Sequence, residues 1–208
     1  MQELKDLQKM IDELNNSTST NEKISVLEQY KNNVGVCKLL EYTHSQFKQF
    51  NVTPANCEKK NELITPKVHP DIFALLNDLH NRVITGNNAI GAVNKFTSTY
   101  PEYKELVYRI LNRNLKTRVG TSIINRIIPG CIPVFNVALA QKYEAVSKKI
   151  DFKNQEWFAS RKLDGVRCLT IVDANGNVNC YSRAGKEFLT LDKIRTDIAA
   201  TGLRGVVF

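Results

Sequence analysis

A lysine flanked by two arginines and followed by an Asp-Gly pair has the residue types of a covalent nucleophile. The run is Ser160-Arg161-Lys162-Leu163-Asp164-Gly165-Val166-Arg167. An ordinary lysine has a pKa of about 10.4, so an amine that attacks near neutral pH needs its pKa lowered by burial and by neighbouring cations. Arg161 and Arg167 can supply part of that shift. The run therefore predicts an activated lysine, and the alternative is an exposed lysine in a hairpin turn.

The elements that would position this lysine are predicted to be strands. Apolar residues 157–159 indicate a buried strand, the Asp-Gly pair predicts a turn, and residues 166–172 indicate a second strand. A hairpin turn at 173–176 follows. Thr190 is expected to cap the next helix, Gly202 to close it, and residues 205–208 to form one more buried strand.

A second motif follows the lysine run after about twenty residues. It reads Tyr181-Ser182-Arg183-Ala184-Gly185-Lys186-Glu187-Phe188. Lys-x-Asp-Gly-x-Arg followed by Ser-Arg-x-Gly resembles the first two motifs of the covalent nucleotidyltransferases, which are DNA ligases, RNA ligases and messenger-RNA capping enzymes. The resemblance implies that Lys162 attacks the α-phosphate of ATP and holds AMP as a phosphoramidate, with Mg²⁺ neutralising the phosphates.

The resemblance also implies which residues bind the nucleotide. Arg167 and Arg183 would contact its ribose and phosphate region, and Gly165 and Gly185 would allow the backbone to approach it closely. The complete set, with Lys162 as the catalytic residue, is Ser160, Arg161, Lys162, Asp164, Gly165, Arg167, Arg183 and Gly185. Many members of the family carry Glu where this chain has Ser160, so contact of this side chain with the purine base is not assigned. No metal ligand is expected within the chain.

The composition is that of a soluble globular protein with a basic surface. The chain has 208 residues, 42% of them hydrophobic, and a net charge of +8, which is compatible with a polyanionic partner. No apolar run is long enough to span a membrane and the N-terminus does not resemble a signal peptide, so a cytoplasmic protein is expected. Five scattered cysteines lack a C-x-x-C pair, which favours reduced thiols over a zinc site. No phosphate-binding loop of the G-x-x-x-x-G-K-[ST] type is present.

The first hundred residues have helical periodicity throughout. Leu4, Leu7, Ile11 and Leu14 predict one helix, Ser19 and Glu22 form a capping box for a second, and a third runs through Cys37, Leu40 and Phe47. Residues 50–68 are expected to be a long surface connection. Pro70 should start a helix that buries Ile72, Leu75, Leu76, Leu79 and Val83, and another is expected from Ala89 to Phe96.

Residues 104–126 carry many bases and the single acid Glu105. A helix with Arg109, Arg113 and Lys116 on its polar face is expected to break at Val119-Gly120. Thr121 and Ser122 should then cap a short helix, 123–128, whose N-terminus suits a phosphate. The alternative is a solvated basic face and an ordinary cap.

This basic segment is similar to the end of the all-helical DNA-binding domain that precedes the catalytic domain in many ATP-dependent DNA ligases. In them the segment contacts the duplex backbone across the minor groove. Such contacts position the protein without reading sequence. The implied DNA-binding residues are Arg109, Arg113, Lys116, Arg118, Gly120, Thr121 and Ser122.

The Pro129-Gly130-Cys131-Ile132-Pro133 run indicates a domain boundary. We therefore predict a helical DNA-binding domain at 1–130, a linker at 131–136, and the first portion of an α+β nucleotidyltransferase domain with an antiparallel sheet at 137–208. The order of parts most closely resembles the ATP-dependent DNA ligases of tailed bacteriophages, with their roles in DNA replication, repair and recombination. The family's later motifs are absent from these 208 residues, so this chain alone is not expected to seal nicks.

Three functions are compatible with these features. The first is a monomeric ATP-dependent DNA ligase that acts on nicked double-stranded DNA, of which this chain is a part. The second is an RNA ligase or capping-type enzyme, which shares the lysine motif but usually begins near it. The third is a DNA-binding fragment without catalytic activity.

Overall fold

The computed structural model describes residues 1–135, 137, 140–159, 161 and 164–208. These residues divide into two compact units, Met1–Val134 and Phe135–Phe208. Among the described residues, the first unit contains helices and no strand, and the second contains a small antiparallel sheet. The predicted fold class, a helical part followed by an α+β part with an antiparallel sheet, is therefore confirmed. No helix in the described part of the chain is long and apolar enough to cross a membrane.

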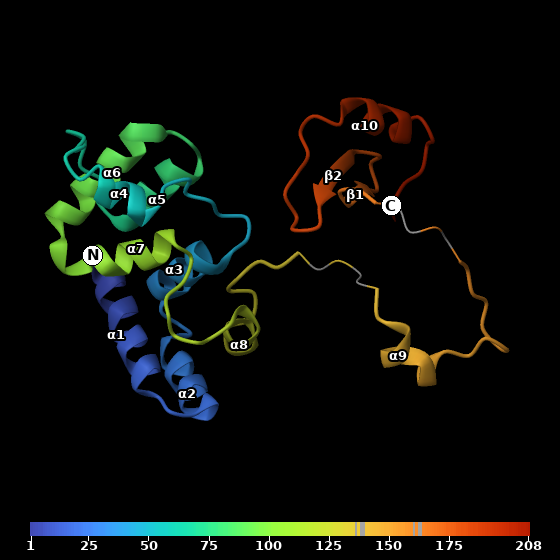
Figure 1. Ribbon diagram of the computed structural model, residues 1–208, viewed down its shortest axis with the longest axis horizontal. Coiled ribbons are helices and arrows are strands. Elements are labelled where there is room, and N and C mark those ends of the chain that lie inside the picture. The colour runs from blue at the N-terminus through green and yellow to red at the C-terminus, as the bar shows by residue number, and fades with distance from the viewer. Residues whose placement is uncertain (136, 138–139, 160, 162–163) are drawn as a thin grey trace. The chain divides into compact units, whose positions relative to one another are not determined.

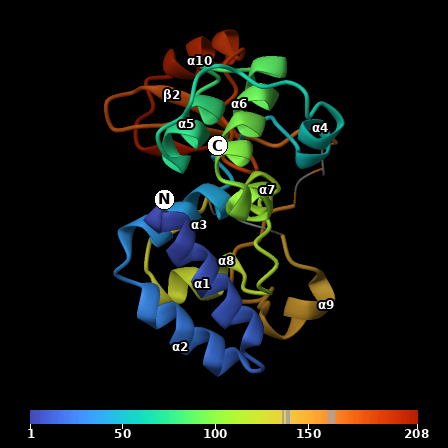
Figure 2. The same ribbon diagram turned by 90° about the vertical axis from the view of Figure 1, so that its left-hand side faces the viewer.

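The first unit consists of short helices packed in two groups. In chain order they are α1 (Gln2–Asn16), α2 (Thr20–Tyr30), α3 (Val34–His44), α4 (Pro54–Lys59), α5 (Ile72–His80), α6 (Gly86–Thr99), the 3-10 turn η1 (Pro101–Tyr103), α7 (Lys104–Leu111) and α8 (Thr121–Ile127). Figures 1 and 2 show α1, α2 and α8 at one end of this unit and α4, α5 and α6 at the other. α3 and α7 lie between the two groups and contact each other.

One apolar core joins these helices. Leu4, Leu7, Ile11 and Leu14 of α1 are at most 1% exposed, as their spacing predicts. The periodic residues of α5 are buried in the same way, and α6 and α7 add Phe96, Val107 and Ile110. Burying a side chain of this size contributes roughly 1.5–3 kcal/mol, so this core is the main source of the unit's stability.

Side-chain caps set where several helices begin. Ser19 accepts a hydrogen bond from the N–H of Glu22, and the Glu22 carboxylate accepts one from the N–H of Ser19. This is the predicted capping box, and it satisfies N–H groups that have no partner within the helix. The hydrogen bond from the N–H of Thr18, and next that from the N–H of Ser19, hold the pKa of the Glu22 carboxyl below its usual value.

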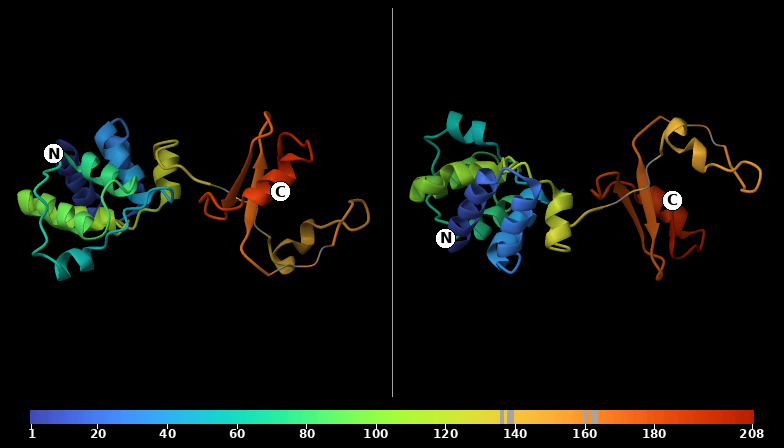
Figure 3. Two further views of the ribbon diagram at one scale, coloured as in Figure 1. Left: turned by 90° about the horizontal axis from the view of Figure 1, so that it is seen from above. Right: turned by 90° about the horizontal axis from the view of Figure 1, so that it is seen from below.

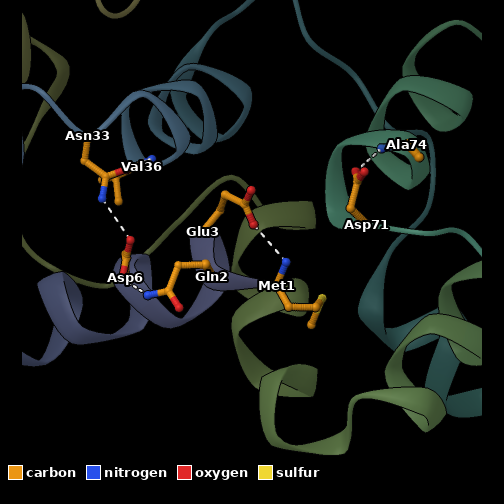
Figure 4. Close-up of polar contacts among 8 residues, drawn as sticks. All are labelled: Met1, Gln2, Glu3, Asp6, Asn33, Val36, Asp71 and Ala74. Atoms are coloured by element: carbon orange, nitrogen blue, oxygen red, sulfur yellow. Dashed lines mark hydrogen bonds and ion pairs between the residues drawn. The ribbon is translucent and has the colours of Figure 1, made fainter.

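Asn33 starts α3 and also ties it to α1 (Figure 4). Its side-chain oxygen accepts from the N–H of Val36 at 3.1 Å, and its amide nitrogen donates to Asp6 of α1 at 2.9 Å. Asp71 caps α5 in the same way, through the N–H of Ala74. A single polar side chain therefore caps the start of each of these two helices.

Several predictions for the helices of residues 1–100 are wrong. The third helix is expected to run through Phe47, but α3 ends at His44 and Phe47 is 38% exposed. Residues 50–68 are not simply a surface connection, because Pro54 begins α4, Thr53 caps it, and Phe50 and Cys57 are buried. The helix expected to include Val83 ends at His80, and Val83 is 66% exposed. A left-handed residue, Arg82 with φ 57°, follows the end of α5 and takes the chain away from the core.

The second unit is built on a three-stranded sheet in the order β2-β1-β3. Its elements are α9 (Tyr143–Val146), the 3-10 turn η2 (Ser147–Lys149), β1 (Cys168–Val172), β2 (Val178–Ser182), α10 (Asp192–Ala199) and β3 (Val206–Val207). Asp173 makes the predicted hairpin turn by accepting from the N–H groups of Asn175 and Asn177, both at 2.8 Å. α10 packs against β2, which Figure 3 shows from two sides.

The predicted strand at 157–159 is absent from the described residues. Phe158 is 85% exposed, and Trp157 instead stacks on Phe152 with ring centroids 5.3 Å apart. The indole of Trp157 also donates to the carbonyl of Asp151 at 3.1 Å. Local aromatic packing therefore replaces the expected burial in a sheet.

The other boundaries in the second unit are also shifted. The strand expected from Val166 begins at Cys168, and Val166 is 82% exposed. Leu191, and not Thr190, is the residue before α10, and it makes no side-chain cap. The strand expected to be buried at 205–208 is short, and Val207 is 63% exposed because β3 pairs only with β1 and lies at the edge of the described sheet.

Candidate nucleotide and DNA contact sites

The pairing of β1 with β2 brings two of the predicted nucleotide-binding arginines together. Cys168 is the register partner of Ser182. Arg167 directly precedes Cys168, and Arg183 directly follows Ser182. Because the strands are antiparallel, both arginines lie at the same end of the hairpin, and both are exposed. Guanidinium groups carried at this end of the hairpin have the charge and the donors that suit a phosphate.

A tight turn positions Arg183. The N–H of Gly185 donates to the carbonyl of Ser182 at 2.9 Å, and the N–H of Ser182 donates to the carbonyl of Lys186 at 2.8 Å. Gly185 has φ 76°, which glycine adopts without strain and which three-residue hairpin loops require at this position. Arg183 is thereby exposed at the turn while Gly185 is buried.

The central residues of the lysine motif, Lys162 and Ser160, lie outside the described residues. Of the neighbouring predicted residues, Arg161, Asp164 and Gly165 are exposed. Gly165 has φ 155°, a conformation that residues with a side chain rarely adopt, and there is open space where a Cβ would be. The roles of these residues toward a nucleotide therefore stay predictions.

In the first unit, the predicted DNA-binding residues do not share one helix. α7 ends at Leu111, and residues 112–120, which we call the basic loop, follow it. The expected break at Val119-Gly120 is therefore wrong. Arg113, Lys116 and Arg118 all have φ near 58° (58°, 58° and 57°), a left-handed conformation that a helix cannot contain.

Buried side chains hold the basic loop against the helices. Leu115, Thr117 and Val119 are 2%, 5% and 7% exposed, and the residues between them, Lys116 and Arg118, are exposed. The ammonium group of Lys23 on α2 donates to the carbonyl of Thr117 at 2.9 Å. The loop therefore presents its two outward cations from a fixed backbone, which lowers the entropy cost of contact with a partner.

Arg113 is directed toward the protein. Its guanidinium donates to the carbonyls of Thr43 at 3.4 Å and His44 at 3.3 Å, and also to that of Ser45. These are the carbonyls at the C-terminal end of α3, which have no partner within the helix. Burial, and next the Arg113 charge, lowers the pKa of His44 below its usual value. The structure thus gives Arg113 a role in holding α3, and its contact with DNA stays a prediction.

The short helix α8 does not begin as expected. Gly120 precedes it, Thr121 and Ser122 are its first two residues, and neither supplies a side-chain cap. Asn125 belongs to no motif in the sequence, yet its side chain donates to the carbonyl of Ile132 and accepts from its N–H, both at 2.8 Å. Asn125 therefore folds the segment after α8 back onto this helix.

The cysteines do not form a metal site in the described part of the chain. No group of three or more His, Cys, Asp or Glu side chains is placed there to hold an ion. Cys131 donates to the carbonyl of Cys37 at 3.5 Å, and burial together with Cys37 raises the pKa of Cys131 to about 12. The Cys131 thiol is therefore protonated near neutral pH.

Known proteins with similar sequences are DNA ligases. The chain is 29% identical over 199 residues to the DNA ligase of Enterobacteria phage T4, and equally to that of phage T6; each match covers 91% of this chain and 40% of the relative. The DNA ligase of African swine fever virus is 28% identical over 118 residues, which is 56% of this chain and 26% of the relative. No protein-family model matches the chain.

A solved structure is also similar to this chain. The chain called Pmar-Lig_PreS3 has a TM-score of 0.69 and 25% identity, and the match covers 94% of this chain and 46% of that chain. The chain thus spans less than half the length of these relatives. Fold and sequence together relate it to the DNA ligases. Among these, the resemblance to the ligases of tailed phages is confirmed by the similarity to those of phages T4 and T6.

Proposed function

We propose that this chain is the AMP-accepting and DNA-holding part of an ATP-dependent DNA ligase. The Lys162 amine attacks the α-phosphate of ATP, pyrophosphate leaves, and a P–N bond holds AMP on the lysine. The 5′-phosphate at a nick then attacks that phosphorus and releases the lysine. The 3′-hydroxyl finally attacks the activated 5′-phosphate, so that the nick closes and AMP leaves.

The observation that carries this proposal is the register of β1 on β2. It places Arg167 and Arg183 at one end of the hairpin, and Lys162 precedes Arg167 by five residues. The two guanidinium groups would bind the phosphates of the nucleotide, and any cation beside the attacking amine would favour its neutral form. Gly165 and Gly185 would leave room for the nucleotide, with Ser160, Arg161 and Asp164 around it.

Magnesium would neutralise phosphate charge in this reaction. The described residues contain no cluster of carboxylate, histidine or cysteine side chains that fits such an ion. No step of the proposed reaction is therefore assigned to a metal held by this chain.

The helical domain predicted at 1–130 would hold nicked duplex DNA. The linker predicted at 131–136 would join it to the catalytic portion at 137–208. Lys116 and Arg118 are outward cations on a backbone fixed by buried neighbours. Contacts with phosphates position a protein without reading sequence, which suits an enzyme that closes nicks anywhere during DNA replication, repair or recombination. The enzyme would act as a monomer.

Transfer of label from ATP tests the catalytic part of the proposal. The full-length protein containing this sequence is incubated with ATP labelled at the α-phosphate, and protein-bound label is measured. We expect label on the wild type and on Lys186→Ala, which removes an exposed lysine from the second motif, and none on Lys162→Ala. Label retained on Lys162→Ala would falsify the assignment of the nucleophile.

The salt dependence of duplex binding tests the DNA-holding part. Each lost phosphate contact should reduce the slope of log affinity against log salt by about 0.9. Lys116→Gln and Arg118→Gln should each show this loss on all duplex sequences alike. Lys9→Gln, which removes an equal charge from a side chain that is 71% exposed on α1, should not. Equal losses in all three variants would mean that net charge alone governs binding.

A further inference from the structure

The single acid of the 104–126 stretch lies between two of its bases. Glu105 Oε1 is 3.0 Å from Nε of Arg109, one turn later on α7, and 3.7 Å from Nζ of Lys116 in the basic loop. Both bases belong to the predicted DNA-binding set. One carboxylate oxygen therefore occupies the position between two cations that an oxygen of a phosphate could take.

The two cations differ in how far their side chains are exposed to solvent. The Arg109 side chain is 23% exposed, and those of Lys116 and Glu105 are 64% and 63% exposed. A partly buried guanidinium has lost much of its hydration, so an anionic partner is favourable there. Glu105 provides that partner, but an exposed carboxylate is held weakly and can be displaced.

The surroundings leave room for such an exchange. Arg109 and Lys116 line a surface hollow of about 450 Å³ formed by α4, α7 and the basic loop. Asn112 and Asn114 line it as well and offer amide groups, and Glu58 adds a second carboxylate. The hollow is large enough for a phosphate group. A phosphate can accept two hydrogen bonds from a guanidinium, and it is therefore a better partner for Arg109 than a carboxylate that accepts only one.

We propose that Glu105 holds Arg109 and Lys116 in the free protein and is displaced by a phosphate of the DNA backbone when duplex binds. This inference rests on the proposed DNA-holding function and adds to it a regulating residue. Glu105 keeps the two cations positioned without a ligand, and it weakens binding because the phosphate must replace it. The acid therefore lowers the affinity for duplex.

Glu105→Gln tests this inference in the full-length protein with a labelled nicked duplex of random sequence. Removing one negative charge beside a phosphate should raise affinity about three- to tenfold at low salt, and the gain should shrink as salt increases. Glu102→Gln is the matched control, because it removes an equal charge from an exposed residue on η1. Lys116→Gln in the Glu105→Gln background should cancel most of the gain.

The outcomes separate the inference from the proposed function. The proposed function stands if the wild type binds duplex and Lys116→Gln weakens that binding. In that case the inference is wrong if the affinity of Glu105→Gln for duplex equals that of the wild type, or exceeds it by no more than the affinity of Glu102→Gln does. If the wild type does not bind duplex at all, the DNA-holding function fails and the inference with it. Thermal unfolding of each variant shows whether a changed affinity comes from a changed fold, and a Glu105→Gln protein that unfolds early would indicate a structural role instead.

Discussion

Replacing Arg113 should destabilise the first unit far more than replacing its neighbours in the basic loop. The Arg113 guanidinium donates to the carbonyls of Thr43, His44 and Ser45 at the end of α3. A hydrogen bond from a charged donor contributes about 1.5–3 kcal/mol, and a cation at a helix C-terminus about 0.3–1 kcal/mol. The three contacts share one charge and do not add, so Arg113→Ala should cost about 2 kcal/mol.

Arg113→Gly provides an internal check of this magnitude. Arg113 has φ 58°, a conformation that costs alanine and arginine alike but costs glycine little. Both variants lose the guanidinium, but only glycine relieves the backbone strain. We therefore expect Arg113→Gly to be less destabilised than Arg113→Ala by about 0.5–1 kcal/mol.

Chemical and thermal unfolding measure the stability losses of Arg113→Ala and Arg113→Gly. A loss of about 2 kcal/mol corresponds to a fall in Tm of roughly 4–8 °C for a chain of this size. Lys116→Ala, an exposed residue with the same φ, should leave the free energy of unfolding nearly unchanged. Proton NMR of His44 adds a local readout, since its pKa should rise when the Arg113 charge is removed. An unchanged Tm in Arg113→Ala, or a less stable Arg113→Gly, would refute the reasoning.

Two further predictions concern stability. The Cys131 thiol has its pKa raised to about 12 by burial and by Cys37, so the unfolded chain loses this proton at lower pH than the folded chain does. Stability should therefore be complete below the unfolded pKa of about 8.5 and fall as pH rises above it, and Cys131→Ser should flatten that fall in urea titrations between about pH 8 and 10. Separately, a Cβ at Gly91 would lie 2.9 Å from Cγ2 and 3.2 Å from the backbone nitrogen of Thr65. Gly91→Ala should thus cost about 1–3 kcal/mol by overpacking, and calorimetry showing a stabilised variant would contradict this packing.

Local sequence rules determined much of the helical unit. The spacing of Leu4, Leu7, Ile11 and Leu14 predicted a buried helical face, and the Ser19–Glu22 pair predicted a capping box; both are present. The hairpin turn at Asp173 was predicted in the same way. These features depend on residues within one or two turns of each other, so the sequence contains all the partners they need.

The two motifs by themselves also indicated the resemblance to DNA ligases. Lys162, Arg167 and Arg183 carry the resemblance, and the similarity to phage DNA ligases supports it. The position of Arg167 and Arg183 at one end of the same hairpin follows only from the pairing of Cys168 with Ser182. Register depends on how two strands meet, and spacing along the chain does not specify it.

The direction of the basic side chains was decided by tertiary contacts. Helical periodicity placed Arg109, Arg113 and Lys116 on one polar face, but the partners of Arg113 are about seventy residues away, at the end of α3. Those unsatisfied carbonyls attract the guanidinium, and the buried residue Leu115 helps to hold the chain in its left-handed turns. The sequence by itself thus determined that this segment is basic, and the packing of α3 against α7 determined which of its cations face solvent.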